Sequence, residues 1–461
     1  MLRRLSLLVI VLSLGACAHY PVNEKLSELD PDGGYRFKNL NNEDNTDSLF
    51  VILTFSGGGT RAAAFSYGVM EQLKATTIMV NGQPKRLLDE VDVISSVSGG
   101  SFTAAYFGLF GDALFTEFED EFLYRNVQGA LIRRVLLNPF NWFRLASPSY
   151  DRIDLAADYY DKTIYQKQRY SQLIESRRRP FVILNATDIG TGARFEFTQN
   201  QFDWLYSDLS NYSVARAVAA SSAFPVLLSP MRVHNYENPL TNGGEHDPKF
   251  KGEPKWLKPA LKDADRVDTR YYRAREITSY TRDPDRPYIH LMDGGLADNI
   301  GLRGPLWAMR STDSPWSVVN RMNNEEIDTL LVISVDAKTA NDSNINEKKN
   351  APGLLKVFGV VATTPMANYS SDTVHDFHAA FDQWKKDQRE LEAIGEDVHM
   401  VDYYDVHVGF EEVTDPELRD RVSTLPTSFK LKRGEVDALR EAANDALTNS
   451  ATFKEFVEAM Q

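Results

Sequence analysis

Residues 50–60 read Phe-Val-Ile-Leu-Thr-Phe-Ser-Gly-Gly-Gly-Thr, an apolar run that ends in three consecutive glycines. The run 50–55 predicts a buried strand, and a helix is expected to begin at about Thr60. The same order recurs at 91–94, where an apolar run leads through serines and glycines into the helical pattern of 102–115. Three further apolar runs predict buried strands, at 181–184, 288–292 and 330–335. Strands that alternate with helices predict an α/β fold of three layers, with helices on both faces of a mostly parallel sheet.

Glycines gather directly after three of these predicted strands, at 57–59, 99–100 and 294–295. Sites in open α/β sheets form outside the carboxyl ends of the strands. We therefore expect the three glycine clusters to meet at one edge of the sheet, and each of them carries a residue type that can do chemistry.

Ser98 lies in the second cluster, where residues 96–100 read Ser-Val-Ser-Gly-Gly. A serine on a sharp strand-to-helix turn, with glycine beside it, is the arrangement of a nucleophile elbow, whose usual pattern is G-x-S-x-G. Ser96 replaces the first glycine of that pattern, and Ser98 has the required offset from Gly100. The alternative is a serine-rich helix cap. The motif by itself leaves both interpretations open.

The first cluster, Gly57, Gly58 and Gly59, precedes Thr60 and Arg61 at a predicted helix start. Backbone N–H groups at such a position bind anions, and in acyl transfer they would form an oxyanion hole. A phosphate site is the competing interpretation, but the Lys-Ser/Thr ending of a P-loop is absent. The third interpretation is a tight turn with no binding role. Arg61 is a candidate to contact the headgroup of a substrate. Its alternative is a structural ion pair with an acid.

The third cluster contains Asp293, which ends a predicted strand. Its carboxylate would point into the same site. The alternative is that it caps the following turn. A serine nucleophile needs a base. Four histidines follow Asp293, namely His375, His378, His399 and His407, and none lies in a glycine-framed turn. His290 would point to the opposite face of its strand. A dyad of Ser98 and Asp293, with the carboxylate as base, is the simplest hypothesis. A histidine triad would need one of the four to be essential, and a metal pair at His375 and His378 is disfavoured.

Together and in this order, the three clusters resemble the patatin-like phospholipase family. That family has a glycine-rich oxyanion loop, a G-x-S-x-G serine and a D-G-G/A aspartate, and it has no catalytic histidine. Residues 185–188 (Asn-Ala-Thr-Asp) and 215–225 also match in kind. The resemblance covers roughly 49–340, and more loosely 406–439.

The resemblance implies a patatin-like three-layer fold and a serine acyl hydrolase of the phospholipase A or lysophospholipase type that acts on membrane lipids without a metal or cofactor. Ser98 would be the nucleophile, Asp293 the base, and Gly57, Gly58 and Gly59 the oxyanion hole. Ser96 departs from the family pattern, which puts the fine geometry of the elbow in doubt. The alternative is a non-catalytic lipoprotein that keeps the fold to bind lipid or a partner protein.

The N-terminus has the pattern of a bacterial lipoprotein signal. Arg3 and Arg4 precede an apolar run of ten residues, too short to span a bilayer, that ends in Leu-Gly-Ala before Cys17. Cys17 is the single cysteine of the chain, and we expect it to be lipidated. By resemblance to lipoprotein sorting, Ala18 favours a lipid-anchored protein of the outer membrane that faces the periplasm. The alternative is an ordinary cleavage site with a chance cysteine.

The chain of 461 residues carries 65 acidic and 51 basic residues, for a net charge of −14. This balance argues against a nucleic-acid partner, and one cysteine excludes an intramolecular disulfide. We expect a signal peptide at 1–16, a tether at 17–48, a catalytic core at 49–340 with an inserted polar segment at 233–287, and a mostly helical extension at 341–461. The inserted segment is either a plain surface loop or a substrate-facing flap. Residues 131–144, apolar with interleaved arginines, form either a membrane interface or a buried helix followed by a turn.

Overall fold

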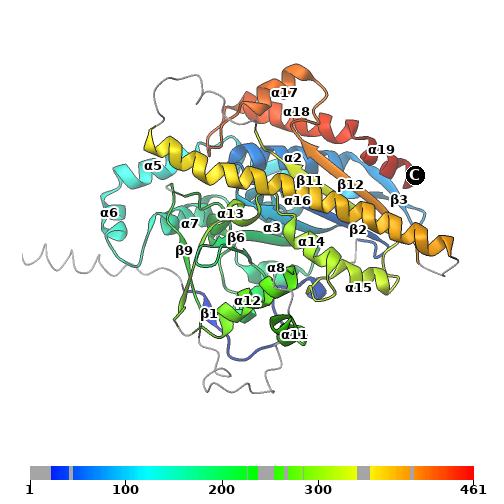
Figure 1. Cartoon of the computed structure of the whole chain (residues 1–461). Coiled ribbons are helices and arrows are strands. Elements are labelled where there is room, and N and C mark those ends of the chain that lie inside the picture. Colours follow the sequence, from blue (N-terminus) through cyan, green and yellow to red (C-terminus); the bar gives the residue numbers. More distant parts are fainter. Residues whose placement is uncertain are drawn as a thin grey trace, which may run out of the picture.

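The computed structural model describes residues 22–40, 45–225, 227–236, 254–263, 268–283, 285–339, 353–394 and 399–461. An eight-stranded sheet occupies the centre of this part of the chain (Figure 1). Its order is β12-β11-β2-β5-β6-β10-β9, and β7 also pairs with β6. The strands are β2 (Leu49–Phe55), β5 (Val91–Val97), β6 (Phe181–Asp188), β7 (Ala193–Glu196), β9 (Met231–His234), β10 (Tyr288–Asp293), β11 (Thr329–Asp336) and β12 (Asp402–Gly409).

All five strands predicted from the sequence are confirmed, and the sheet is mostly parallel. Every residue of β2, β5 and β6 is buried, because helices cover both faces of the sheet. The five strands from β12 to β6 run parallel to one another, whereas β10, β9 and β7 are antiparallel to their neighbours. The sequence interpretation missed β12, which lies in the segment expected to be mostly helical and extends the sheet beyond β11.

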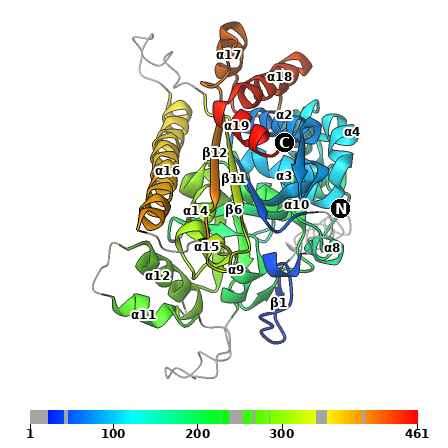
Figure 2. The ribbon, with the colours of Figure 1, turned by 90° about the vertical axis from the view of Figure 1, so that its right-hand side faces the viewer.

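Figure 2 shows the three layers, with the sheet between two sets of helices. One layer contains α2 (Thr60–Ala75), α3 (Ser98–Phe110), α10 (Val214–Ser221) and α18 (Arg433–Asn449). The other contains α13 (Gly295–Asp298), α14 (Arg303–Arg310), α15 (Val318–Asn323) and the long α16 (Leu354–Ala393). Because α2 and α3 start directly after β2 and β5, two of the glycine clusters lie at strand-to-helix turns, as predicted.

The third glycine cluster lies near the other two, but the strand before it runs in a direction that we did not expect. We expected parallel strands to bring the three clusters together, but β10 runs antiparallel to β6. Val97, at the end of β5, pairs with Asn185 of β6. Asp293, at the end of β10, pairs with Ala186, the next residue along β6. The carboxyl ends of β5 and β10 therefore meet on β6 from opposite directions.

Residues 22–40, which belong to the tether expected at 17–48, pack against the core of the protein. Tyr35 and Phe37 are at most 3% exposed and pack against Phe181 of β6. The Tyr35 hydroxyl accepts a hydrogen bond from the Val182 N–H at 2.8 Å. A short strand, β1 (Glu24–Lys25), pairs with β8 (Ser207–Asp208). The polar composition of the segment concealed these two aromatic anchors.

The remaining elements surround this core. The described part of the inserted segment 233–287 includes α11 (Leu257–Lys262) and α12 (Thr269–Thr281), which share a small apolar cluster of their own. The hairpin β3 (Thr77–Val80) and β4 (Gln83–Arg86) follows α2. The other α-helices are α4 (Leu114–Phe118), α5 (Val127–Leu137), α6 (Pro139–Leu145), α7 (Arg152–Thr163), α8 (Tyr170–Ser176), α9 (Gln199–Trp204), α17 (Pro416–Ser423) and α19 (Ala451–Ala459). Among the described residues, no helix has both the length and the apolar character needed to cross a bilayer.

Candidate active site

Ser98 occupies a sharp turn between β5 and α3. Its φ angle is +48°, a left-handed conformation that a residue with a side chain rarely adopts without cause. The backbone N–H of Ser98 donates to the Ser221 hydroxyl at 2.9 Å, and the Gly100 N–H donates to the Ser56 carbonyl at 3.2 Å. These bonds hold the turn in its strained form. The predicted elbow geometry is therefore present, and Ser98 is not a plain helix cap.

Ser96, the departure from the family pattern, fits this turn. Its side chain is fully buried and donates to the Ile183 carbonyl at 3.2 Å, and it accepts a hydrogen bond from the Ser101 hydroxyl at the same distance. A buried hydroxyl with both partners satisfied costs little. The replacement of glycine by serine at position 96 leaves the strained conformation of Ser98 intact.

Asp293 faces Ser98 from the end of β10. Its side chain is 2% exposed, and one carboxylate oxygen accepts a hydrogen bond from the Gly295 N–H at 2.9 Å. Burial raises the pKa of Asp293 to about 6, although the Gly295 N–H and the neighbouring Ser98 side chain oppose that rise. Asp293 is therefore mostly ionised at neutral pH, and it is a stronger base than an exposed carboxylate.

The glycine loop between β2 and α2 lies directly against the Ser98 turn. A Cβ atom added to Gly99 would lie 2.0 Å from the Gly59 carbonyl oxygen. Gly59 has a φ of +62°, and a Cβ there would lie 2.5 Å from the Ser428 carbonyl oxygen. Only glycine lets three backbone segments approach this closely. Glycine at these two positions is thus required by packing, and the result is a row of backbone amides next to the Ser98 turn.

The N–H groups of this row are not equally available. The Gly57 N–H donates to the Asn299 carbonyl at 2.9 Å, so that the expectation of an oxyanion donor at Gly57 is not supported. Within the described part of the chain, the N–H groups of Gly58, Gly59 and Gly99 have no acceptor. Gly99, the residue after the serine, was not among the expected donors. The G-x-S-x-G pattern could have indicated it, because the residue after the nucleophile commonly supplies one such N–H group.

Ser221, at the end of α10, is the residue that the sequence interpretation overlooked. Besides accepting from the Ser98 N–H, its hydroxyl shares a hydrogen bond of 2.9 Å with the Ser101 hydroxyl. Its carbonyl accepts from the Gly294 N–H at 3.0 Å, and the Ala223 carbonyl accepts from the Asp293 N–H at 3.1 Å. The turn after α10 therefore connects the Ser98 turn with the end of β10. Residues 221–225 were noticed from the family resemblance, but without a role.

Arg61 lies inside the protein and does not face a substrate site. Its side chain is 4% exposed, and it donates to the carbonyls of Ala337 at 2.9 Å and Leu425 at 2.6 Å. Burial lowers its pKa to about 10, and the Asp336 carboxylate partly offsets that loss. Arg61 thus has structural partners, but they are carbonyls and not the acid that the alternative named. The guanidinium lies against the glycine loop, 3.2 Å from where a Cβ on Gly58 would be.

Three of the four histidines considered as bases have other partners. His378 pairs with Asp405, His399 lies 2.9 Å from the Ile327 carbonyl, and His407 lies 3.0 Å from the Ser334 hydroxyl. His290 alternates with Asp293 along β10 and faces outward, as predicted. In the described residues, no group of histidine, cysteine and acidic side chains has the arrangement of a metal site.

Helix α16 covers the Asp293 side of this region. It packs against α13, the short helix that follows Asp293. The Met366 methyl group lies 2.1 Å from where a Cβ of Gly295 would be, so that glycine at 295 leaves room for the helix. Cys17, the expected lipidation site, lies outside the described residues.

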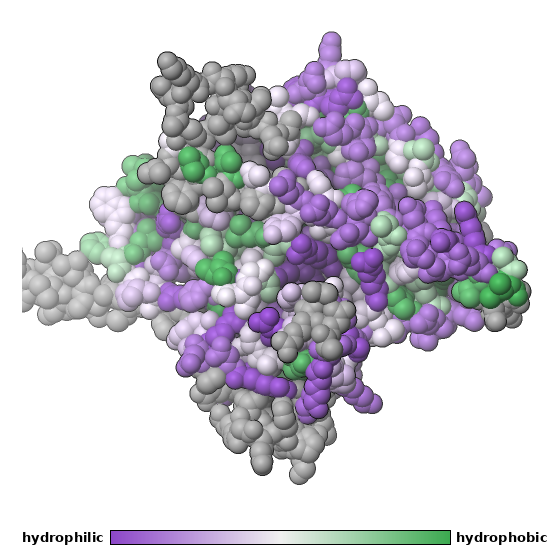
Figure 3. Space-filling view, viewed as in Figure 1, coloured by the Kyte–Doolittle hydropathy of each residue, from purple (hydrophilic) through white to green (hydrophobic). Residues whose placement is uncertain are grey.

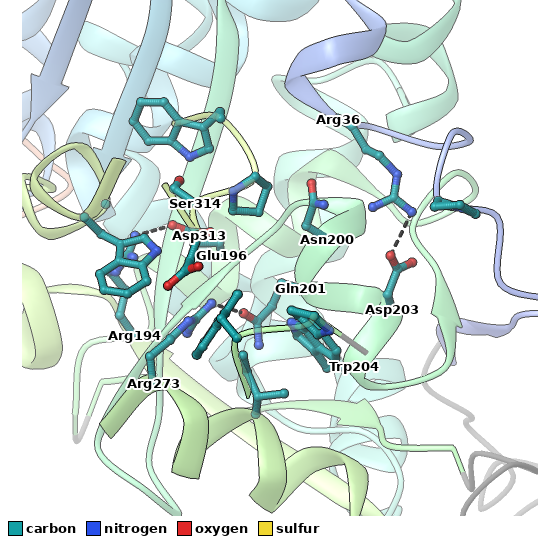
Figure 4. Close-up of a pocket in the computed structure, with 18 of the residues that line it drawn as sticks. Arg36, Arg194, Glu196, Asn200, Gln201, Asp203, Trp204, Arg273, Asp313 and Ser314 are labelled. Carbon is teal, nitrogen blue, oxygen red and sulfur yellow. Dashed lines mark hydrogen bonds and ion pairs between the residues drawn. The ribbon is translucent and has the colours of Figure 1, made fainter. Parts of the chain in front are cut away.

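A separate cavity of about 270 Å³ lies between β7, α9, α12 and the chain around Trp316 (Figure 4). Ser98 and Asp293 do not line it. Its charged side chains are paired with acids, as in the Arg36–Asp203 contact at 2.8 Å and the Arg273–Glu276 contact at 2.6 Å. The described part of the inserted segment 233–287 borders this cavity, with Trp256 and Arg273.

The comparisons with known proteins concern the same region. The family model of the patatin-like phospholipases matches residues 53–306, more than half of the chain. No protein with a curated description matches the chain significantly. Two structures of human GIVD cytosolic phospholipase A2 align with TM-scores of 0.42 and 0.40, at 12% and 11% identity. One of them holds methyl gamma-linolenyl fluorophosphonate. Both alignments cover 90% of this chain but only 62% and 59% of the human chains. VipD from Legionella pneumophila aligns with a TM-score of 0.26 and 13% identity, over 92% of this chain and 70% of its own.

Proposed function

The chain belongs to the patatin-like phospholipase family, and from this premise we propose that it is a serine acyl hydrolase that cleaves lipid carboxylic esters with Ser98 and Asp293. The observation that carries the proposal is that a serine in a strained turn adjoins a buried carboxylate whose pKa is raised to about 6. A base needs a pKa near the operating pH to be effective.

In the proposed reaction, Ser98 Oγ attacks the ester carbonyl while Asp293 takes the hydroxyl proton. The carbonyl oxygen becomes an oxyanion, which the free N–H groups of Gly58, Gly59 and Gly99 surround. Each such donor commonly contributes about 3 kcal/mol to the stability of the transition state. Asp293 then returns the proton to the leaving alcohol, and an acyl-serine remains. Water, activated by the same carboxylate, releases the fatty acid and restores Ser98.

The strength of the base limits the range of substrates. A carboxylate with a pKa of about 6 is a modest base. Esters have better leaving groups than amides and suit this pair. Membrane lipids, with phospholipids or lysophospholipids first among them, are the ester class that we propose.

The proposed location rests on the N-terminal sequence alone. We propose that Cys17 is lipidated and anchors the protein in a bacterial envelope, at the outer membrane and facing the periplasm. Several acyl chains on one residue give durable anchoring. Labelled palmitate should enter the wild-type chain and not the Cys17→Ser variant, and equal labelling of both would refute the anchor.

The function is tested with the purified chain on two substrates, mixed phospholipid vesicles and a soluble short-chain chromogenic ester. Ser98→Ala and Asp293→Asn should each abolish acid release. A control variant with His375, His378, His399 and His407 changed to glutamine should keep it. A serine-reactive fluorophosphonate should label the wild type and not Ser98→Ala.

Each outcome has a defined meaning. Loss of activity in the histidine variant, if that variant is folded, would replace the dyad by a triad. A folded wild type that neither releases acid nor reacts with the fluorophosphonate would contradict the hydrolase proposal. The protein would then be a lipid-binding or scaffolding lipoprotein.

A further inference from the structure

Helices α5 and α6 form a hairpin that carries large apolar side chains into solvent. Six of them are between 46% and 73% exposed, namely Ile132, Leu136, Leu137, Phe140, Trp142 and Phe143. Figure 3 shows apolar surface gathered at the left of the molecule, over these two helices. We call these six side chains the apolar hairpin surface. Exposed apolar residues that cluster in this way mark an interaction site, whereas scattered ones do not.

The hairpin is held together by polar contacts, so that its apolar side chains stay outside. The Trp142 indole N–H donates to the Val135 carbonyl at 2.6 Å, and the Asn141 amide donates to the Arg134 carbonyl at 3.0 Å. Asn138 caps α6 through the Phe140 N–H at 3.1 Å. The alternative of a buried helix for residues 131–144 is therefore wrong. Leu131 packs against the core, but the six exposed apolar side chains do not.

The charge of the hairpin is opposite to that of the whole chain. Residues 126–150 contain three arginines and no acidic residue, in a protein with a net charge of −14. Arg134 lies over the Tyr159 ring, and Arg144 pairs with Asp158 at 2.7 Å. Arg133 is exposed and makes no ion pair with any residue that the structure describes. Apolar and aromatic side chains mixed with arginines suit the surface of an anionic bilayer.

The hairpin is also connected to the glycine loop. At the start of α5, the Gln128 N–H donates to the Phe429 carbonyl at 3.1 Å. The neighbouring Ser428 carbonyl accepts from the Thr60 N–H at 2.9 Å. Helix α5 has 11 residues, a length of about 16 Å. The exposed end of the hairpin therefore lies about one helix length, ~16 Å, from the segment at Ser428 that contacts the glycine loop.

From these observations we propose that α5 and α6 dock the protein on an anionic phospholipid bilayer. The apolar hairpin surface enters the boundary between headgroups and acyl chains, and Arg133 lies among the lipid phosphates. This proposal does not depend on the proposed lipid anchor at Cys17. Docking does not depend on the proposed hydrolase activity, but it would bring lipid esters to the site beside the glycine loop.

The first experiment asks which face touches lipid. Ile394 is the matched control for Leu137, because both side chains are 73% exposed. Ile394 caps the C-terminal end of the long helix α16 and is not part of the hairpin. In the full chain with Cys17→Ser, an environment-sensitive dye is attached to Leu137→Cys or Ile394→Cys. Anionic phosphatidylglycerol vesicles should shift the emission of the first label to the blue and leave the second unchanged. Any binding by the N-terminal apolar run is common to both variants.

Two results of this experiment would overturn the proposal. One is an equal response of the two labels to vesicles, or no response of either. The other is a blue shift of the Leu137 label that needs no vesicles and grows with protein concentration, which would make the hairpin an interface between two copies.

Arg133→Glu should weaken binding to anionic vesicles about tenfold and leave binding to zwitterionic vesicles nearly unchanged. Equal weakening on both would contradict the role of charge.

The second experiment measures hydrolysis. The double variant Leu137→Ser/Phe140→Ser should lose about tenfold or more of the activity on vesicles and keep the wild-type activity on the soluble ester. Ile394→Ser should keep both. A double variant that matches the wild type on vesicles would refute the docking role. If the wild type hydrolyses neither substrate, the proposed function fails, and the dye experiment still decides the docking surface.

Discussion

At the residue scale, the site depends on the environment of Asp293. Burial raises its pKa to about 6, so that the carboxylate loses its proton near that pH. Because the base must be ionised to accept the Ser98 proton, kcat/KM should rise about tenfold per pH unit below 6 and level off above it. A pH profile with the soluble ester measures this. A profile that stays flat down to pH 4 would show that Asp293 is not the base.

The raised pKa of Asp293 also predicts that its ionised carboxylate lowers the stability of the folded protein. The folded-state pKa lies above the unfolded value of 3.8, so that ionisation of Asp293 disfavours the folded state as the pH rises through about 6. Asp293→Asn should therefore increase the free energy of unfolding by about 2 to 3 kcal/mol at pH 8, and have little effect at pH 4. Urea unfolding at the two pH values tests this. Equal effects at both would mean that the pKa of Asp293 is not raised.

At the element scale, the turn after α10 holds two strand ends together. Ser221→Ala removes the acceptor of the Ser98 N–H and leaves that buried group without a partner. We expect kcat to fall roughly ten- to hundredfold, KM to change little, and the free energy of unfolding to fall by about 1 to 3 kcal/mol. The control is the neighbouring Ser222→Ala, whose hydroxyl donates to the Val218 carbonyl within α10. It should lose stability but keep kcat, and equal losses of kcat in both variants would contradict the role of Ser221.

At the scale of the whole molecule, two helices from distant parts of the chain pack tightly against each other. Helices α2 and α18 approach so closely that a Cβ on Gly68 would lie 2.8 Å from the Arg440 Cα atom. Gly68→Val should therefore force these helices apart, which costs about 1 to 3 kcal/mol and lowers Tm by about 3 to 10 °C. The control is Gly353→Val, because no atom of the described residues lies within 4 Å of where a Cβ on Gly353 would be. An unchanged Tm in Gly68→Val would show that the two helices can separate freely.

The sequence by itself determined the five predicted strands, the glycine turns, and the positions of Ser98 and Asp293. These features follow from local rules: an apolar run has to be buried, and a crowded left-handed turn requires glycine. Only the tertiary structure decided the direction of β10, the role of Ser221, the loss of the Gly57 N–H to Asn299, and the burial of Arg61. Each of these depends on a partner distant in the chain. Ser98 and Ser221, for example, are 123 residues apart, and no local pattern specifies which distant group a backbone N–H will meet.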